Sequence, residues 1–361
     1  MIIEITKPNF KAIIQNSKFA LPRRWDGSDF YETLKSLYNE YQLQISTYTS
    51  KSAQQKVKTM CDNILKTVEY YHNGFPNKAF KHMGVVMKKL IRNPLKVYRK
   101  SGWTEAFENN DPLMLYRIRN VQNNTLYCRR DIFHTPYNLR SKVSTCRYSI
   151  SGYPALYLGT SLELCCEESK INNVQDFTIA SRYKIERNMQ YNNEMVIDVI
   201  ELGIKPKDFM DHERPNLYNE DNTIVNSRRF NEIDLNSIEV MSAYLYWYPL
   251  IAACSFIRVN KNDPFAAEYI IPQLLMQWVR NESEDEKLIG IRYFSCASER
   301  ISELGFNYVF PVSGEKDFCY NKYCKVLANV FKLTNPVYMH EFSSIADCEF
   351  HLQNTTEFEK I

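Results

Sequence analysis

The sequence has little glycine and lacks the two glycine-rich loops that most often bind nucleotide phosphates. Only 10 of its 361 residues are Gly, and neither G-x-G-x-x-G nor G-x-x-x-x-G-K-[S/T] occurs. In these loops backbone amides approach the phosphates closely, which glycine permits because it has no side chain. If this chain binds a nucleotide, it must therefore do so with side chains.

The sequence also lacks the apolar segments that direct proteins into or across membranes. It contains no run of about 18 uncharged apolar residues, the length that a membrane span requires. Glu4 and Lys7 interrupt the first apolar stretch, which makes it a poor signal peptide. We expect a cytoplasmic protein whose ten scattered cysteines stay reduced.

The cysteines show no arrangement typical of a metal site. Cys319 and Cys324 have four residues between them, and no second pair with matching spacing is present. Structural zinc sites take four ligands, which commonly come as two such pairs. We therefore expect no metal in this protein.

Positive charge is concentrated near the N-terminus, although the net charge of the whole chain is only +3. Residues 1–110 contain 18 Lys and Arg against 9 Asp and Glu, and residues 77–100 contain eight basic residues and no acidic one. Nucleic acid or an acidic protein surface could be attracted to such a segment. We favour an ordinary amphipathic helix, because apolar residues recur there at helical spacing with most lysines between them.

The apolar pattern divides the chain into a helical part and a mixed part. Two stripes at helical spacing precede the basic segment, and the first begins with a capping box at Asp29. Short apolar runs typical of strands follow at residues 113–119, 154–158, 195–204 and 288–295. We expect an α+β protein with a helical region at 1–108, a catalytic domain at 109–345 and a C-terminal tail at 346–361.

Residues 146–169, CRYSISGYPALYLGTSLELCCEES, combine a turn, a strand and the start of a helix. Gly152 and the residues around it predict a turn, because glycine tolerates the positive φ angles that many turns require. The apolar run 155–158 indicates a mostly buried strand. Thr160 and Glu163 have the spacing of a capping box, which predicts that a helix begins directly after the strand.

Glu168 is the notable residue of this expected helix. It lies four residues after Leu164 and shares its face, whereas Glu167 points about a quarter-turn away. A carboxylate on an inward face needs a partner or a chemical task, because Glu is seldom buried without one. A salt bridge to Arg147 or a solvated helix face are the structural alternatives.

Three separated pieces of the sequence carry a common pattern. The run LYRIR places Arg117 on an expected strand, and GIRYFS ends at Ser295. Between them, RYSISGYPALYLG places Arg147 before an aromatic strand that contains Tyr157, and Glu168 follows eleven residues later. This set resembles the RES domain family, which is named for its Arg, Glu and Ser. The segments FHTPYNLR and YIIPQLLMQW are also similar to parts of that family.

The resemblance covers about residues 112–300 and implies an ADP-ribosyltransferase-like mixed β core with flanking helices, which consumes NAD. RES proteins often act as the toxin of a toxin–antitoxin pair, with an Xre-like DNA-binding antitoxin as partner. The helical N-terminal region and the long 171–245 region exceed a minimal RES domain. These additional regions indicate that the protein could be an effector of phage defence instead of a simple two-component toxin.

The resemblance also implies a role for each residue of the set. Glu168 would hydrogen-bond the ribose hydroxyls of NAD and stabilise an oxocarbenium-like transition state. Arg117 and Arg147 would bind the diphosphate, and Tyr157 would offer a face to the nicotinamide ring. Ser295 would bond the carboxamide or a ribose hydroxyl. NAD is thus expected as substrate, with no metal.

Several alternatives stay open at this point. Arg119, Arg140 and Glu167 lie close in sequence to the favoured residues and could replace them. The ADP-ribosyl group could pass to water or phosphate, as in an NAD glycohydrolase or phosphorylase, or to a protein or nucleic acid, as in an ADP-ribosyltransferase. A non-enzymatic module that binds nucleic acid through the 77–100 helix is the third reading, and a homo-oligomer is compatible with all three.

Overall fold

The structure is a computed structural model, and it divides the chain into two compact units. The first is Met1–Gly102 with Ile204–Trp278, and the second is Trp103–Gly203 with Val279–Ile361. We describe each unit by itself. The structure describes residues 3–91, 115–121, 126–171, 177–185, 190–191, 194–195, 198–211, 235–260, 262–282, 288–312 and 322–361.

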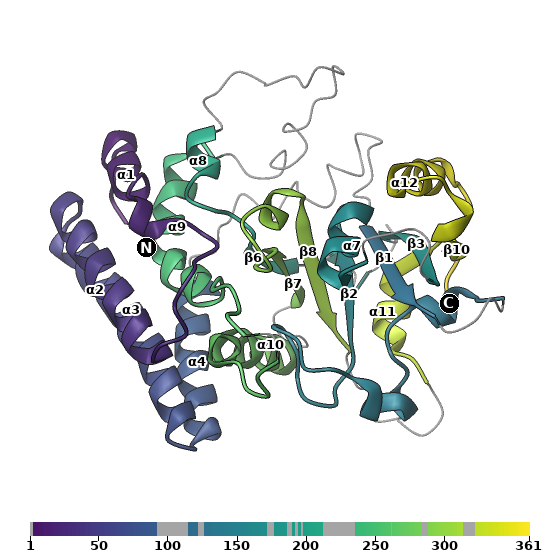
Figure 1. The fold of residues 1–361 in the computed structure, drawn as a ribbon. Coiled ribbons are helices and arrows are strands. Elements are labelled where there is room, and N and C mark those ends of the chain that lie inside the picture. The colour runs from purple at the N-terminus through teal and green to yellow at the C-terminus, as the bar shows by residue number, and fades with distance from the viewer. Residues whose placement is uncertain are drawn as a thin grey trace. The chain divides into compact units, whose positions relative to one another are not determined.

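The described part of the first unit is helical (Figure 1). Helix α3 packs against α2, α4 and α9. The α-helices are α1 (Lys7–Ile14), α2 (Phe30–Tyr48), α3 (Lys51–His72), α4 (Pro76–Ile91), α8 (Asp208–Asp211), α9 (Ile238–Ala253) and the first part of α10 (Ile270–Glu282). Short 3-10 turns lie at η1 (Ser17–Phe19) and η4 (Ala267–Tyr269).

The N-terminal helices form where the apolar stripes and caps predicted them. The Asp29 side chain accepts a hydrogen bond from the Glu32 amide at the start of α2. Helix α4 buries one apolar face and exposes Lys78, Lys81 and Lys88 on the other, which confirms the amphipathic interpretation for residues 76–91. The remainder of the expected basic helix, residues 92–100, lies outside the described residues.

Helix α9 explains why residues from the middle of the chain belong to the first unit. Its side chains are buried on nearly every side, so neighbours must cover it all round. The Tyr38 hydroxyl donates to the Pro249 carbonyl and the Tyr41 hydroxyl to the Leu245 carbonyl, each at 2.7 Å. The expected catalytic domain at 109–345 includes this helix, whereas the compact units assign residues 204–278 to the helical unit. The expected boundary at residue 108 lies outside the described residues.

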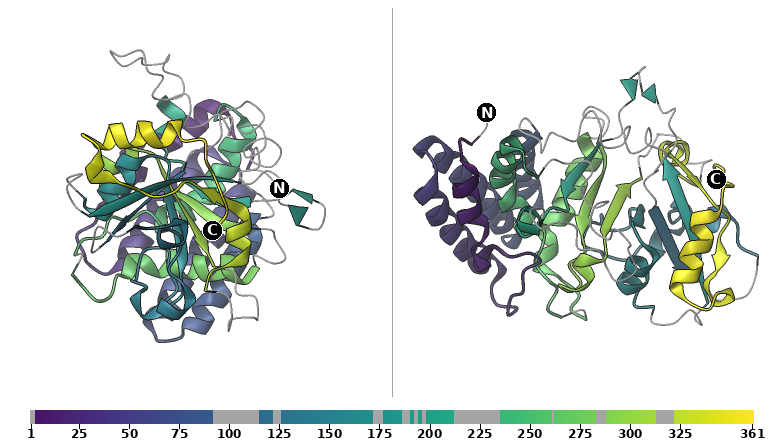
Figure 2. Two further views of the ribbon diagram at one scale, coloured as in Figure 1. Left: turned by 90° about the vertical axis from the view of Figure 1, so that its right-hand side faces the viewer. Right: turned by 90° about the horizontal axis from the view of Figure 1, so that it is seen from above.

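The second unit is built on a mixed sheet with the strand order β10-β3-β1-β2-β8-β7-β6, and β9 also pairs with β3 (Figures 1 and 2). The pairing is antiparallel except between β6 and β7. The strands are β1 (Leu115–Asn120), β2 (Ala155–Gly159), β3 (Thr178–Ile185), β6 (Asp198–Leu202), β7 (Leu288–Phe294), β8 (Phe306–Pro311), β9 (Phe331–Leu333) and β10 (Val337–Tyr338). Strands β4 (Gln190–Tyr191) and β5 (Glu194–Met195) form a separate pair.

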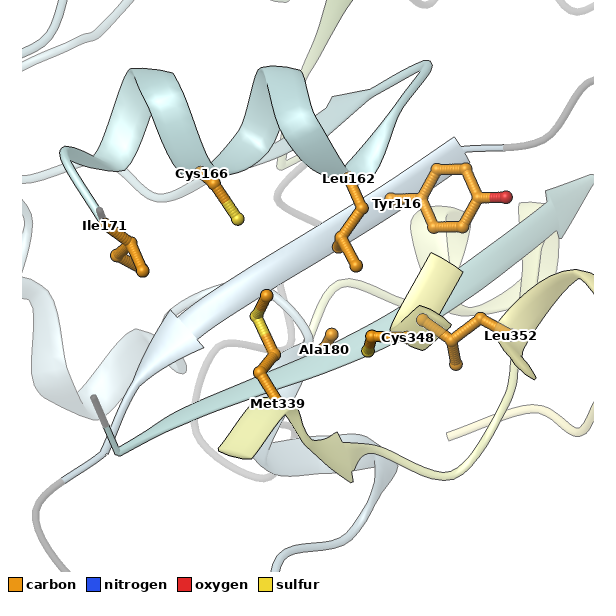
Figure 3. Close-up of a cluster of buried hydrophobic side chains, with 8 residues drawn as sticks. All are labelled: Tyr116, Leu162, Cys166, Ile171, Ala180, Met339, Cys348 and Leu352. Carbon is orange, nitrogen blue, oxygen red and sulfur yellow. The ribbon is translucent and has the colours of Figure 1, made fainter. Parts of the chain in front are cut away.

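Helices α7 (Leu162–Ser169) and α12 (Ile345–Asn354) pack over strands β1 and β3 of this sheet. Figure 3 shows the cluster that joins them, in which α7 and α12 meet side chains from β1 and β3. Its buried members are Tyr116, Leu162, Cys166, Ile171, Ala180, Met339, Cys348 and Leu352. The segment expected as a tail, 346–361, thus contains a helix whose inner face belongs to the core.

The α+β class is confirmed, while part of the sheet was missed. The expected runs form β1, β2, β6 and β7. Strands β3, β8, β9 and β10 were not predicted. Strand β8 is buried at all six residues, so its sequence FNYVFP lacks the alternation that identifies a half-exposed strand. The remaining short helices of the second unit are α6 (Arg129–Ile132), η3 (Tyr137–Lys142), η5 (Ile301–Glu303), α11 (Lys325–Val330) and η6 (Met339–Glu341).

Candidate functional site

The turn, strand and helix of residues 146–169 form as expected, with one correction at the helix cap. Gly152 adopts a positive φ of 67° in the turn, and β2 and α7 follow. The N-cap is Ser161, whose hydroxyl accepts from the Leu164 amide at 3.2 Å, and not Thr160. Thr160 accepts instead from the Phe306 amide at 2.9 Å. The Thr160 hydroxyl therefore does not cap α7, because it binds the backbone of strand β8 instead.

Glu168 lies on the last turn of α7 and is bound to the sheet. Glu168 is exposed, so the expectation that its carboxylate faces inward was wrong. One oxygen nevertheless accepts a hydrogen bond from the Asn307 side chain, with 2.8 Å between Asn307 Nδ2 and Glu168 Oε1. Asn307 is on β8 and is itself only 7% exposed. A solvent-accessible carboxylate is thus tethered at one oxygen by a buried amide.

Glu167 has a different environment from its neighbour. Its Oε1 forms an ion pair with the Arg300 guanidinium. The hydrogen bond that Arg300 donates to Glu167 raises the pKa of Arg300. A carboxylate engaged by a full positive charge is less available to a substrate, which favours Glu168 over Glu167 as the functional carboxylate.

Arg117 on β1 is placed beside Tyr157 of β2. Its Nη1 donates to the Tyr157 main-chain carbonyl at 2.8 Å, and its buried Nε makes no hydrogen bond to the described residues. Burial lowers the pKa of the Arg117 guanidinium, although the pKa of an Arg starts so high that the group stays charged. A buried Nε–H without an acceptor is costly unless an anion or polar group approaches it.

The ladder between β1 and β2 is open beyond its first pair. The register between these two described strands consists of Tyr116 opposite Gly159 alone, whereas β1 pairs with β3 at six positions. The bond from Arg117 to the Tyr157 carbonyl therefore occupies a part of β2 that the β1 backbone does not pair. At this position a side-chain donor bonds to the β2 backbone where a continuous ladder would use a backbone amide.

Tyr157 belongs to a group of three tyrosines. Its hydroxyl donates to the Tyr148 carbonyl, and the Tyr148 ring lies 4.5 Å from the Tyr293 ring of β7, measured between centroids. Burial raises the pKa of Tyr293, the negative charge of Glu168 adds to the rise, and the positive charge of Arg147 opposes it. The phenol of Tyr293 therefore lies within electrostatic range of both candidate charges.

The structure thus brings most of the predicted residues into one region of the second unit. Arg147 follows Cys146 before the turn. Its positive charge lowers the pKa of Tyr293, and the negative charge of Glu168 raises it. Ser295 follows β7 two residues after Tyr293 and is fully buried. The Ser295 hydroxyl accepts from the Ala297 amide at 3.1 Å, which closes a turn. Its predicted role toward a ligand has no further support from these contacts.

The two alternative arginines are engaged elsewhere. Arg119 donates to the Asp131 carbonyl. The Arg140 guanidinium lies 5.4 Å from the ring centroid of Tyr137 and 5.6 Å from that of Tyr153, in cation–π geometry. Neither contact connects these side chains to Glu168. By contrast, Arg147 and Glu168 both affect the pKa of Tyr293.

Two residues of this region were not predicted from the sequence. Tyr293 lies inside the quoted GIRYFS motif, which points to it only as a strand residue. Asn307 lies in the missed strand β8, so nothing in the sequence connects it to Glu168, which is 139 residues away. A polar residue within an apolar run of strand length is the one signal that could have found Asn307.

A third overlooked residue is His134, in the FHTPYNLR segment. It is fully buried; its Nδ1 lies 2.8 Å from the Thr135 carbonyl, and its Nε2 accepts from the Cys324 amide at 2.8 Å. Burial lowers the pKa of His134 to about 4, so the imidazole is neutral at pH 7. These bonds indicate a residue that fixes the loop before α11.

The described residues contain no group of three or more His, Cys, Asp or Glu that could bind a metal ion. Their nine cysteines are free thiols, and Cys319 of the predicted weak pair lies outside the described residues. Among the described helices, none has the length and apolar character of a membrane span.

Comparison with known proteins gives one match. Over 339 residues the chain is 28% identical to a protein of Bacillus subtilis (strain 168) named "Putative toxin YopC", and the match covers 90% of this chain and 69% of that protein. A match of this length includes residues of both compact units. No protein-family model matches the chain, and no solved structure does.

Proposed function

We propose that the protein is an NAD-degrading enzyme that cleaves the nicotinamide–ribose bond and acts as a toxin or a defence effector. The observation that carries the proposal is the contrast between two adjacent carboxylates. Glu167 is ion-paired with Arg300, whereas Glu168 is exposed and receives a single neutral hydrogen bond from Asn307. One carboxylate is therefore available to a substrate at a site that also contains Arg117, Arg147 and three tyrosines.

The chemistry of NAD suits a site with one available carboxylate. The bond between the ribose carbon and the pyridinium nitrogen breaks, and its electron pair leaves with nicotinamide, which departs neutral without needing a general acid. Positive charge develops on the ribose, and the ionised Glu168 stabilises it while accepting a hydrogen bond from a ribose hydroxyl. The acceptor oxygen, from water or phosphate, then bonds to the ribose carbon and loses its proton.

The remaining side chains have roles in binding. Arg117 and Arg147 bind the diphosphate, the first from a fixed position beside β2 and the second from the turn before it. Tyr157 offers an aromatic face for the nicotinamide ring. Ser295 contributes a hydroxyl to the nicotinamide carboxamide or the ribose.

The fold is proposed to be ADP-ribosyltransferase-like, as in the RES family. The mixed sheet and its flanking helices are consistent with that class, and the open ladder between β1 and β2 offers a place for an extended substrate. The resemblance in sequence at Arg117, Arg147, Glu168 and Ser295 supports the same assignment.

The toxin role draws support from the similar protein of Bacillus subtilis, whose name describes it as a toxin. By the same reasoning an Xre-like antitoxin or another inhibitory protein is the expected partner, and a homo-oligomer is compatible with it. The match extends into the helical unit, so we propose that α1 to α4 belong to the functional protein and sense a trigger or bind the inhibitor.

The test is to incubate the purified full chain with NAD and to measure NAD and nicotinamide by chromatography. We expect release of nicotinamide by the parent protein. Glu168→Gln, which keeps the shape and the Asn307 bond but removes the charge, should slow release by about 100-fold or more. Glu167→Gln is the matched control and should retain activity. Equal activity of the two variants would contradict the assignment, and intact NAD with folded parent protein would contradict the function.

The second product identifies the acceptor. ADP-ribose indicates water, and ADP-ribose 1″-phosphate formed only with added phosphate indicates phosphorolysis. Label transferred from adenine-labelled NAD to a macromolecule would favour the ADP-ribosyltransferase alternative. Each product requires the same bond cleavage, so Glu168→Gln should slow the formation of all three to the same extent.

A further inference from the structure

We infer that Asn307 is a positioning residue that orients Glu168. The inference rests on the proposed function, because it concerns the carboxylate to which that function assigns the chemistry. Neither the RES pattern in the sequence nor the list of expected site residues includes Asn307.

Asn307 lies on an interior strand of the sheet. Strand β8 has β2 on one side and β7 on the other, and Asn307 is in register with Gly159 and Tyr293. Every residue of β8 is buried. A side chain on a strand packed on both sides has little freedom, so it is a firm support for a group on a neighbouring helix.

Gly159 permits α7 to approach this strand. A Cβ at Gly159 would lie 2.7 Å from Cys165 Sγ, a separation that real Cβ atoms essentially never show. The helix therefore lies against the place where a side chain at 159 would be. Because Gly159 is opposite Asn307, the same close approach brings Glu168, at the end of α7, within 2.8 Å of the Asn307 amide.

The chemistry of the contact favours a carboxylate. The buried Asn307 amide nitrogen can only donate, and burying such a group without an acceptor is costly. The bond holds Oε1 of Glu168 against strand β8. The other oxygen, Oε2, is then left to accept a hydrogen bond from a ribose hydroxyl of the substrate. Asn307 itself touches neither NAD nor the reacting carbon in this arrangement.

Asn307→Asp provides the sharpest test, because it keeps the shape of the side chain and replaces the donor by an acceptor. Two carboxylates would then face each other, and the charged form of Glu168 would be disfavoured. We expect the acidic limb of the kcat/KM profile for nicotinamide release to move to higher pH by about one unit or more. Asn307→Ala should lower kcat about tenfold or more and change KM for NAD little, because orientation is lost while binding remains.

Arg300→Gln is the matched control, since it removes the donor of the neighbouring carboxylate, Glu167. It should leave the pH profile and kcat unchanged. Folding of each variant is checked by circular dichroism and urea unfolding. Folded Asn307→Asp and Asn307→Ala proteins with the parent profile would overturn the inference.

A second readout does not depend on turnover. In protein labelled with ¹³C at Glu side chains, the Glu168 carboxyl signal is assigned by its loss in Glu168→Gln and titrated with pH. Its midpoint should lie at higher pH in Asn307→Asp than in the parent, and an equal midpoint would overturn the inference. If the parent releases no nicotinamide, the proposed function fails while this titration still decides whether Asn307 acts on Glu168.

Discussion

The N-terminal helices and the sheet solve the same packing problem with different side chains. Helices α1 to α4 bury aliphatic and aromatic residues, and none of their buried residues is charged. The described strands of the sheet bury Arg182, Glu201, Arg292 and Asn307 as well. The helices are therefore stabilised by apolar burial, whereas the sheet depends on specific polar partners.

The buried charges of the sheet show what this dependence means. Arg292 Nε lies 2.9 Å from Glu201 Oε2, on the neighbouring parallel strand, and its guanidinium lies 4.2 Å from the Phe306 ring centroid. Arg182 donates to the Leu352 and Gln353 carbonyls at the end of α12. Charged groups in such places cost desolvation energy, so each one constrains the elements around it.

The largest expected effect comes from breaking the Glu201–Arg292 pair. Arg292→Ala removes the cation that faces the buried Glu201 carboxylate, so we expect the free energy of unfolding to fall by about 3–5 kcal/mol. The double variant Glu201→Met with Arg292→Met should recover most of this loss, because it removes both desolvation costs. Urea unfolding followed by circular dichroism measures both.

A helical counterpart sharpens this first comparison. Leu34 is fully buried in α2, and Leu34→Ala should cost about 2–5 kcal/mol through lost apolar burial and a cavity. A second substitution cannot restore the stability lost in Leu34→Ala by removing a partner charge, because Leu34 has none. If the double Met variant were as unstable as Arg292→Ala, the pair would contribute through packing as Leu34 does.

The next effect is a pH dependence from His134. Its pKa is about 4 in the folded protein and about 6.5 when unfolded, so the unfolded chain binds a proton first as the pH falls. Stability is fully present above pH 6.5 and is lost as the pH falls toward 4, by roughly 3 kcal/mol. Protonation would also oppose the bond from the Cys324 amide to Nε2.

Unfolding free energies measured at several pH values test this. His134→Gln should flatten the dependence between pH 4 and 6.5, and His340→Gln, at an exposed site, should leave it unchanged. An unchanged slope in His134→Gln would mean that other groups cause the acid sensitivity.

The smallest expected effect compares one helix cap from each region. Ser50 caps α3 through the Ala53 amide, and Ser161 caps α7 through the Leu164 amide. Replacement of either serine by Ala should cost about 1 kcal/mol. Ser161→Ala should cost slightly more, because Ser161 also donates to the Leu304 carbonyl at 3.2 Å.

Only the cap in the sheet region should affect function. Ser161→Ala loosens the helix that carries Glu168, so nicotinamide release should fall, whereas Ser50→Ala should leave release unchanged. Equal effects on activity would indicate that α7 is fixed by its core contacts and not by its cap.

The sequence pattern was sufficient where a structure depends on neighbours along the chain. Apolar stripes and caps located α2, α3 and α4, and an apolar run with turn residues before it located β2 and its turn. These signals act within a few residues, so a single sequence displays them. The same local reasoning failed for Glu168, because its position relative to Leu164 predicted an inward-facing carboxylate and the residue is exposed.

The sequence by itself determined the helical and mixed parts of this protein, its α+β class and the residue types available to a site. Only the tertiary structure decided that α9 joins the helical unit, that α12 covers the sheet and that Asn307 contacts Glu168. The physical reason is that local backbone preferences are written in adjacent residues. A buried polar contact depends on which distant strand passes beside a helix, and that is settled only when the core packs.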